Sequence, residues 1–263
     1  MSGPSRRFSK TFRLFIVLLA ALPCSAYSSE DFKTIYREAM GGDPEAQYNL
    51  GIAYDKGKGT LRGKEEAVKW YRKAAEQGHA GAQYDLGRSW YSGRGVPQDH
   101  AEAVKWYRKA AEQGHADAQY ALGFLNSEGH SVPQDHAEAV QWYRKAAEQG
   151  HGLAQTNLGG CYYKGKGVPR DCAEAVKWWR KAAEEGGAGA QNNLGIAYHN
   201  GQGVPQDYFL AYFWYSLSAS RSKGEDYRRR AEAGNGIANQ LTPEQRMKTQ
   251  QMIREWEAKH PGK

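Results

Sequence analysis

Histidines recur along the chain at regular intervals and are the first candidates for metal binding or acid–base chemistry. Two sets share an interval of 36 residues, and these are His79, His115 and His151, and His100 and His136. The ligands of one metal ion must all lie within about 2 Å of it, whereas equivalent residues of stacked helices lie about 10 Å apart. The spacing therefore predicts a ladder of histidines, and we expect no metal site and no cofactor.

A possible nucleophile lies in the stretch Ser220-Arg221-Ser222-Lys223, which spells S-x-x-K. This is the serine motif of penicillin-recognising enzymes, but the companion elements S-D-N and K-T-G are absent from the sequence. The sequence also lacks G-x-S-x-G and a phosphate-binding loop. We therefore expect binding rather than catalysis, with a weak penicillin-binding or β-lactamase-like hydrolase of envelope material as the alternative function.

The first 26 residues have the layout of a secretory signal. Four basic residues and no acid precede an unbroken apolar run over residues 14–22, and Cys24, Ser25 and Ala26 supply small residues for cleavage. The run is too short for a bilayer span, which needs about 20 residues. We predict a cleaved signal peptide over residues 1–26 and a periplasmic or secreted bacterial protein, with an uncleaved membrane anchor as the alternative.

Removal of this segment changes the charge of the chain. The formal net charge falls from +7 to +3, because four basic residues and no acids are lost. A nearly neutral protein has little attraction for a phosphate backbone, so we expect no nucleic-acid partner.

Two cysteines are then left, Cys161 and Cys172. An exported protein meets an oxidising compartment, and an even number of cysteines fits one bridge. We predict a disulfide between them, with two reduced and buried thiols as the alternative.

The elements that must position these residues follow from a 36-residue repeat. Tryptophan, glycine and proline all recur with this period, and the tryptophans are Trp70, Trp106, Trp142, Trp178 and Trp214. A period of this size is typical of a solenoid, since one unit cannot bury its apolar face alone.

The spacing inside one copy shows which kind of solenoid this is. In the second copy Ala82, Leu86 and Trp90 form one helical stripe, and residues 93–97 form a loop rich in glycine and proline. An aspartate in the N-cap position then opens a second apolar helical face, which stops before Gly114. The predicted fold class is all-α, a right-handed α-solenoid of five helix-loop-helix repeats.

Three segments of that copy, AQYDLG at 82–87, GRGVPQD at 93–99 and AVKWYRKAA at 103–111, resemble the Sel-1-like repeat, a relative of the tetratricopeptide repeat. The resemblance implies a scaffold for protein complexes, and exported bacterial members are associated with cell-envelope assembly and host contact. A cysteine-rich branch of the family has been described as penicillin-binding. That branch pairs cysteines in nearly every repeat, where this chain has alanines such as Ala75.

The repeats divide the chain into a signal peptide (1–26), an N-terminal capping helix (27–43), five repeats (44–79, 80–115, 116–151, 152–187 and 188–223) and C-terminal capping helices with a tail (224–263). Thr242 and Gln245 have the spacing of a capping box, so a last helix should run to about Ala258. The third copy departs from the others, since Asn126 replaces an aromatic residue and Ser131 a loop glycine, which predicts a loosened repeat. Each tryptophan is expected to pack between its own first helix and the next repeat.

If the stack coils like tetratricopeptide arrays, the first helices line its inner curve, and the residues beside the core stripe point into a groove. These positions are Tyr48, Ile52, Asp55, Tyr84, Arg88, Tyr91, Tyr120, Phe124, Glu128, Thr156, Tyr163, Lys164, Asn192, Ile196 and His199. They differ between copies and are rich in tyrosine, which is typical of binding surfaces. We predict that a protein or peptide partner binds there to a monomeric chain, with mere solvent exposure as the alternative explanation.

Overall fold

The structure is a computed structural model that describes residues 29–129 and 132–260. The predicted signal peptide and Ser131 lie outside these residues. Within them the chain forms thirteen helices and no strands, so the predicted all-α fold class is confirmed. In the same part of the chain, no helix is both long and apolar enough to cross a membrane.

In chain order the helices are α2 (Ser29–Met40), α3 (Pro44–Lys56), α4 (Lys64–Glu76), α5 (Ala80–Ser92), α6 (His100–Glu112), α7 (Ala116–Glu128), α8 (His136–Glu148), α9 (Gly152–Lys164), α10 (Cys172–Glu184), α11 (Ala188–Asn200), α12 (Tyr208–Ser220), α13 (Gly224–Ala238) and α14 (Pro243–Lys259).

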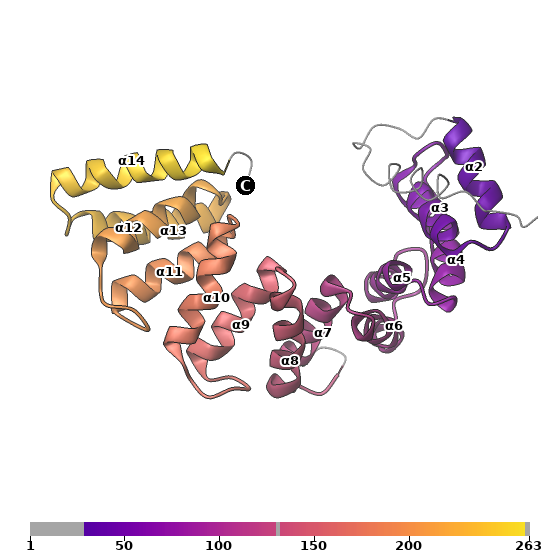
Figure 1. The fold of residues 1–263 in the computed structure, drawn as a ribbon, viewed down its shortest axis with the longest axis horizontal. Helices are drawn as coiled ribbons and strands as arrows, with labels where there is room; N and C mark the ends of the chain where they lie inside the picture. Colours follow the sequence, from indigo (N-terminus) through magenta and orange to yellow (C-terminus); the bar gives the residue numbers. More distant parts are fainter. Residues whose placement is uncertain (1–28, 130–131, 261–263) are drawn as a thin grey trace, which may run out of the picture.

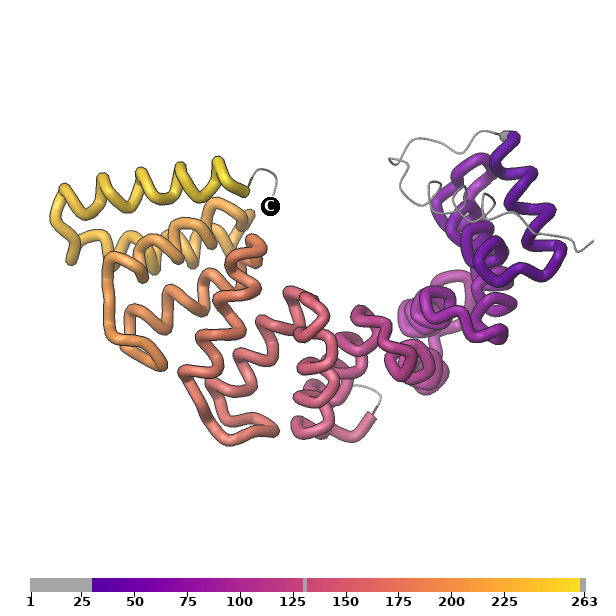
Figure 2. The backbone as a smooth tube through the Cα atoms, in the orientation of Figure 1, coloured from indigo at the N-terminus to yellow at the C-terminus, as the bar shows by residue number. Residues whose placement is uncertain are grey.

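The helices pair within each repeat, and the pairs stack into an open arch (Figure 1). The first pair is α3 with α4, and the pattern continues to α11 with α12. The second helix of each pair packs against the first helix of the next, as α4 does against α5. Figure 2 shows the chain running through successive pairs from α2 at one end of the arch to α14 at the other. This arrangement is the five-repeat solenoid that the sequence predicts.

Most helices of the repeats begin or end at a residue that caps them. The first helices end at a glycine in the left-handed region, such as Gly93 at φ +67°, a conformation that glycine adopts without strain. The second helices of repeats two to five follow an aspartate that accepts a backbone N–H, as Asp99 does from Glu102 at 3.0 Å. The aspartate caps are Asp99, Asp135, Asp171 and Asp207.

The two helices of a repeat approach each other closely at a glycine of the first helix. A Cβ atom on Gly87 would lie 2.8 Å from the Tyr107 ring and 3.2 Å from the carbonyl oxygen of Ala103. The same contact with an aromatic ring is made by Gly51, Gly123, Gly159 and Gly195. A larger residue at these positions would force the two helices apart in a closely packed interior.

The tryptophans are core residues, but they face a different neighbour from the one expected. Trp142 is buried and packs with Tyr107 of the preceding repeat and Leu122 of its own first helix. The prediction that it contacts the next repeat is therefore wrong. Adjacent helical residues are rotated by about 100°, so Tyr143 faces the next repeat, where it packs with Leu158 and Trp178.

Truncation of one tryptophan should open a cavity between two repeats. We expect Trp142→Ala to lower the free energy of unfolding by about 3–5 kcal/mol through lost burial and cavity formation. Chemical denaturation measures this loss, and the thermal transition should broaden because repeats couple only to their neighbours. Lys105→Ala on the exposed face of α6 is the control, and a loss below about 0.5 kcal/mol for Trp142→Ala would show that the ring is not core.

A buried glutamine links each first helix to the helix before it. Gln83 donates from Nε2 to the carbonyl of Ala75 at 3.1 Å and accepts at Oε1 from Gln113 at 2.7 Å. The bond to the alanine carbonyl recurs in all five repeats. In the fourth repeat Glu185 replaces the second glutamine, and Oε1 of Gln155 is buried there without a hydrogen-bond partner.

Restoration of that donor should stabilise the fourth repeat. We expect Glu185→Gln to raise the free energy of unfolding by about 1 kcal/mol, the net value of one hydrogen bond to a buried acceptor. Glu184→Gln removes the same charge one residue earlier and is the matched control in the denaturation experiment. Equal effects of the two variants would mean that charge, and not the bond to Gln155, is responsible.

The two ends of the arch are covered by helices outside the repeats. At the N-terminal end α2 packs on α3, and at the C-terminal end α13 and α14 pack on α12. The predicted capping box is confirmed, because Thr242 and Gln245 each accept the backbone N–H of the other.

In the third repeat Asn126 is buried, and its backbone carbonyl accepts from the Asp135 N–H at 2.9 Å.

Candidate binding groove

The inner curve of the arch carries the positions that the sequence nominates for binding. In the middle of the arch α7 lies on the inner side and α8 on the outer side (Figure 1). The first helices of neighbouring repeats also approach each other there, since α7 contacts α9 directly.

Three of the predicted groove tyrosines are more buried than the sequence suggests. Tyr48, Tyr84 and Tyr120 are half-buried, and each ring lies against the histidine that precedes the next first helix. The ring centroids are 4.5 Å apart for Tyr48 and His79, 4.8 Å for Tyr84 and His115, and 4.7 Å for Tyr120 and His151. Burial raises the pKa of all three phenols above the ordinary value. These rings therefore hold neighbouring repeats together as well as bordering the groove.

The three histidines are helix caps. Nδ1 of His79 accepts the backbone N–H of Ala82 at 3.0 Å, and His115 and His151 cap their own helices in the same way. Nε2 of His79 lies 3.0 Å from Glu45 in the first turn of α3. This role was not predicted, although the position directly before each first helix was the signal for it. The described residues contain no group of three or more His, Cys, Asp or Glu that could hold a metal ion.

His115 has a pKa below its ordinary value. Burial is the main cause, while the nearby carboxylates of Asp117 and Asp85 act against it and His79 adds to it. The neutral ring is the form that can accept the N–H of Ala118. Folding therefore selects the unprotonated ring.

This pKa shift makes the stability of the stack pH-dependent. Because the unfolded chain binds the proton more readily, His115 contributes its full stability above about pH 6.5 and loses it as the pH falls below that value. We expect His115→Asp, which keeps a capping side chain, to show a smaller fall in Tm than the parent between about pH 7.5 and 5.5. Identical falls in Tm for the two proteins would contradict this role of His115.

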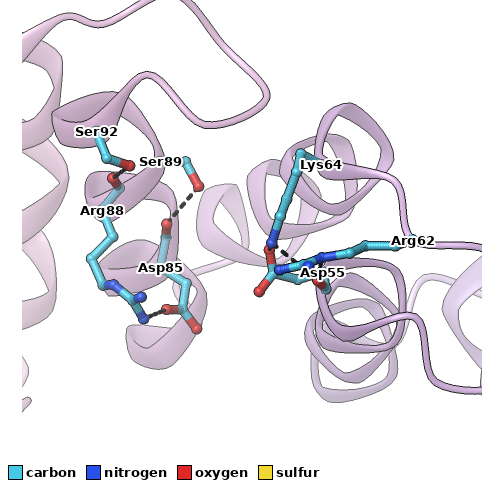
Figure 3. A network of polar contacts seen from close by, with 7 residues as sticks. All are labelled: Asp55, Arg62, Lys64, Asp85, Arg88, Ser89 and Ser92. Atoms are coloured by element: carbon cyan, nitrogen blue, oxygen red, sulfur yellow. Dashed lines mark hydrogen bonds and ion pairs between the residues drawn. The ribbon is translucent and has the colours of Figure 1, made fainter.

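Two predicted groove residues, Asp55 and Arg88, belong to polar networks on the first two repeats (Figure 3). Asp55 pairs with Lys64, and its backbone carbonyl also accepts from Arg62 at 3.0 Å. Arg88 pairs with Asp85 at 2.9 Å, and Asp85 also accepts from the Tyr48 hydroxyl at 3.0 Å. Both networks are partly exposed, and they fix charged groups of known sign along the inner curve.

The structure gathers six of the predicted residues around one hollow of about 500 Å³ between α7, α9 and α11. These residues are Phe124, Glu128, Thr156, Tyr163, Lys164 and Ile196. The lining also includes residues that the sequence analysis did not single out, among them Asn157, Gly160, Lys166, Trp179 and Asn193. The volume is within the range of about 300–1,000 Å³ that is usual for ligand pockets.

The other predicted residues lie elsewhere on the first helices. Tyr91 stacks on His100 with centroids 4.9 Å apart, and His199 meets Tyr208 edge to face at 5.7 Å. Ile52 packs on the core cluster between the first and second repeats. Asn192 is half-buried on α11.

The predicted disulfide is not formed. Cys161 and Cys172 are both free thiols. Cys161 is buried toward the preceding repeat, where it packs with Val140, and burial raises its pKa. Cys172 instead begins α10 beside the loop of the next repeat, with its carbonyl facing Gly203. The sequence places both cysteines in one repeat but does not show that Cys161 is buried against the preceding repeat.

The serine of the S-x-x-K stretch lies at the end of a helix. Ser220 is the last residue of α12, and its Oγ is 3.0 Å from the Leu217 carbonyl and 3.2 Å from Glu257 of α14. Lys223 is the N-cap residue of α13. These contacts join the C-terminal helices and give the hydrolase alternative no support.

Five stacked helical pairs with a lined hollow on the inner curve define an α-solenoid repeat protein. The family model of the Sel1 repeat matches residues 44–79, 80–115, 116–151, 152–187 and 188–223. The chain therefore belongs to the Sel1 repeat family.

Solved structures of similar proteins have the same fold. A Sel1 repeat protein from Oxalobacter formigenes is 41% identical with a TM-score of 0.70, over 74% of this chain and 81% of that one. The protein c5321, a protective antigen present in uropathogenic Escherichia coli strains that displays an SLR fold, is 34% identical with a TM-score of 0.71. That match covers 87% of this chain and 56% of c5321.

A curated relative matches over a short stretch. Chitin synthase regulator SKT5 of Saccharomyces cerevisiae is 49% identical over 47 residues. This stretch is 18% of the present chain and 7% of the yeast protein, so the chain corresponds to a small part of that regulator.

Proposed function

We propose that this protein is an exported adaptor that binds a protein or peptide partner along the inner curve of its solenoid, in bacterial cell-envelope or host-interaction processes. Export to the periplasm or beyond the cell rests on the signal-like pattern of residues 1–26. The adaptor role rests on the fold, because solenoids offer an extended concave surface that each repeat extends.

The observation that carries the proposal is the hollow between α7, α9 and α11. It combines aromatic side chains, such as Phe124 and Tyr163, with charged ones, such as Glu128 and Lys164. Aromatic anchors beside polar groups are the composition of binding hot spots. Core positions such as the leucine and glycine of each first helix are the same in every copy, whereas these positions differ, as expected where packing does not dictate the residue.

One relative agrees with a binding role. It is a regulator of chitin synthase, and its name says that it acts on another protein. That the present chain is not an enzyme stays a prediction from its sequence and its family.

Crosslinking of the protein in its own envelope, followed by mass spectrometry, identifies the partner. With that partner in hand, we expect Arg88→Ala and Phe124→Ala each to weaken binding by about 1 kcal/mol or more in titration calorimetry, the usual threshold for an anchor residue. Both side chains border the inner curve and are partly exposed.

The choice of variants follows from the packing. Tyr84 and Tyr120 are unsuitable, because their rings also stack on capping histidines and their loss would disturb the fold. Lys105→Ala on the outer helix α6 is the control. If Lys105→Ala weakens binding and the two inner variants do not, the partner uses the outer side and the proposal is wrong.

A further inference from the structure

The fourth repeat lacks an aromatic ring that the first three repeats possess. Position five of the first helix is Tyr48, Tyr84 and Tyr120 in those repeats, and it is Thr156 in the fourth. The three rings pack on a tyrosine of their own second helix, with centroids 5.7 to 6.0 Å apart. In the fourth repeat a threonine, Thr156, occupies the position from which the tyrosine ring packs on the second helix.

Two neighbouring positions have also lost their side chains. In the first three repeats His79, His115 and His151 stack on the tyrosine ring. Gly187 occupies the equivalent position in the fourth repeat, and it caps α11 without a side-chain hydrogen bond. Gly160 stands where the other copies have an isoleucine, an arginine or a phenylalanine. A Cβ atom on Gly160 would meet nothing within 4 Å. The hollow thus lies where the fourth repeat has smaller residues than its neighbours.

The first repeat shows what such a place accommodates. There the Tyr48 ring packs beside Tyr71, and its hydroxyl donates to Asp85 at 3.0 Å. The residues 108 positions later are Thr156, Trp179 and Asn193. Asn193 and Trp179 both line the hollow. The fourth repeat therefore has an aromatic ring, Trp179, for a phenol to pack on and a polar side chain, Asn193, to bond its hydroxyl, but it has no phenol at position 156.

The lining is held in place by contacts of its own. Trp179 donates from Nε1 to the carbonyl of Thr156 at 3.0 Å, and its ring packs on Tyr163 at 5.3 Å between centroids. Tyr163 in turn hydrogen bonds to Gln202 of the next repeat. A lining fixed in this way loses little freedom when a ligand binds.

The charged groups of the hollow favour an acidic neighbour for that ligand. Lys164, Lys166 and Glu128 all line the hollow, so positive charge is in excess. The two lysines also lower the pKa of the nearby Cys161 thiol against the effect of burial. A carboxylate beside the bound side chain would therefore be attracted.

We propose that the hollow of the fourth repeat binds a tyrosine side chain of a partner peptide, with its ring among Phe124, Tyr163 and Ile196 and its hydroxyl hydrogen bonded to Asn193. An acidic residue next to that tyrosine meets Lys164 and Lys166. This inference rests on the proposed function, and it names the chemistry that the partner must present to the fourth repeat.

The test compares labelled peptides on the protein and on a variant that carries the missing ring itself. The probe is a fluorescein-labelled peptide of sequence Asp-Glu-Tyr-Glu-Asp, followed by anisotropy, with versions that have alanine or phenylalanine for tyrosine or lysines for the acids. We expect the tyrosine peptide to bind at least about tenfold more tightly than the alanine peptide. The phenylalanine peptide should lie between them, since it lacks the bond to Asn193.

The decisive variant is Thr156→Tyr, which restores the residue of the first three repeats. It should keep or raise Tm and weaken binding of the tyrosine peptide by at least about tenfold, because the protein's own ring fills the hollow. Lys105→Tyr is the matched control, since it adds the same ring on the outer helix α6 at an exposed residue that does not line the hollow, and it should leave binding unchanged. Gly160→Phe fills the same hollow and replaces Thr156→Tyr in the test if that variant fails to fold.

Several results would overturn the proposal. The proposal is wrong if the tyrosine and alanine peptides bind equally, if neither binds, or if Thr156→Tyr does not change the binding. If the lysine-flanked peptide binds as tightly as the acidic one, the proposed acidic neighbour of the tyrosine is wrong. Self-association of the protein that Thr156→Tyr abolishes would assign the hollow to a second copy instead. If the peptides fail while Arg88→Ala still weakens capture of the envelope partner, the proposed function stands and only this inference falls.

Discussion

The contact between a glycine of the first helix and an aromatic ring of the second is the constraint on which every repeat depends. At Gly87 there is no space for even one additional carbon atom. This contact fixes the position of the second helix against the first. One face of the second helix then lies toward the preceding repeat, and another face lies toward the next. Trp106 packs on the preceding repeat and Tyr107 on the next. Stacking therefore follows from pairing.

Much of this fold could be predicted from the sequence, because the signals are local. Asp99 and Thr242 are capping residues whose role depends on the next three residues. Signals that concern neighbouring repeats were less informative. The periodicity places Trp142 and Tyr143 on a core face but does not say which repeat each one meets. In the same way the sequence does not show that Cys161 is buried against the preceding repeat.

The site was predictable in its positions but not in its shape. Helical spacing nominates Phe124, Thr156 and Ile196, and all three line the hollow. The hollow itself depends on what is missing around them, above all a side chain at Gly160. Such a deficit becomes visible only when residues of three repeats are placed side by side. The stacking of tyrosines on capping histidines was missed for a similar reason, since the tyrosine lies on one first helix and the histidine caps the next.

The buried glutamines give the groove a regular length scale. Each of them ties its helix to an alanine carbonyl eight residues earlier, so every joint between repeats is closed by the same bond. Neighbouring first helices, separated by about 10 Å, then follow one another at a nearly constant step. A chain in the polyproline II conformation advances by about 3.1 Å per residue and repeats its orientation every three residues. A ligand of that conformation laid across the repeats would thus present every third residue to an equivalent position, and its own sequence would carry a period of three.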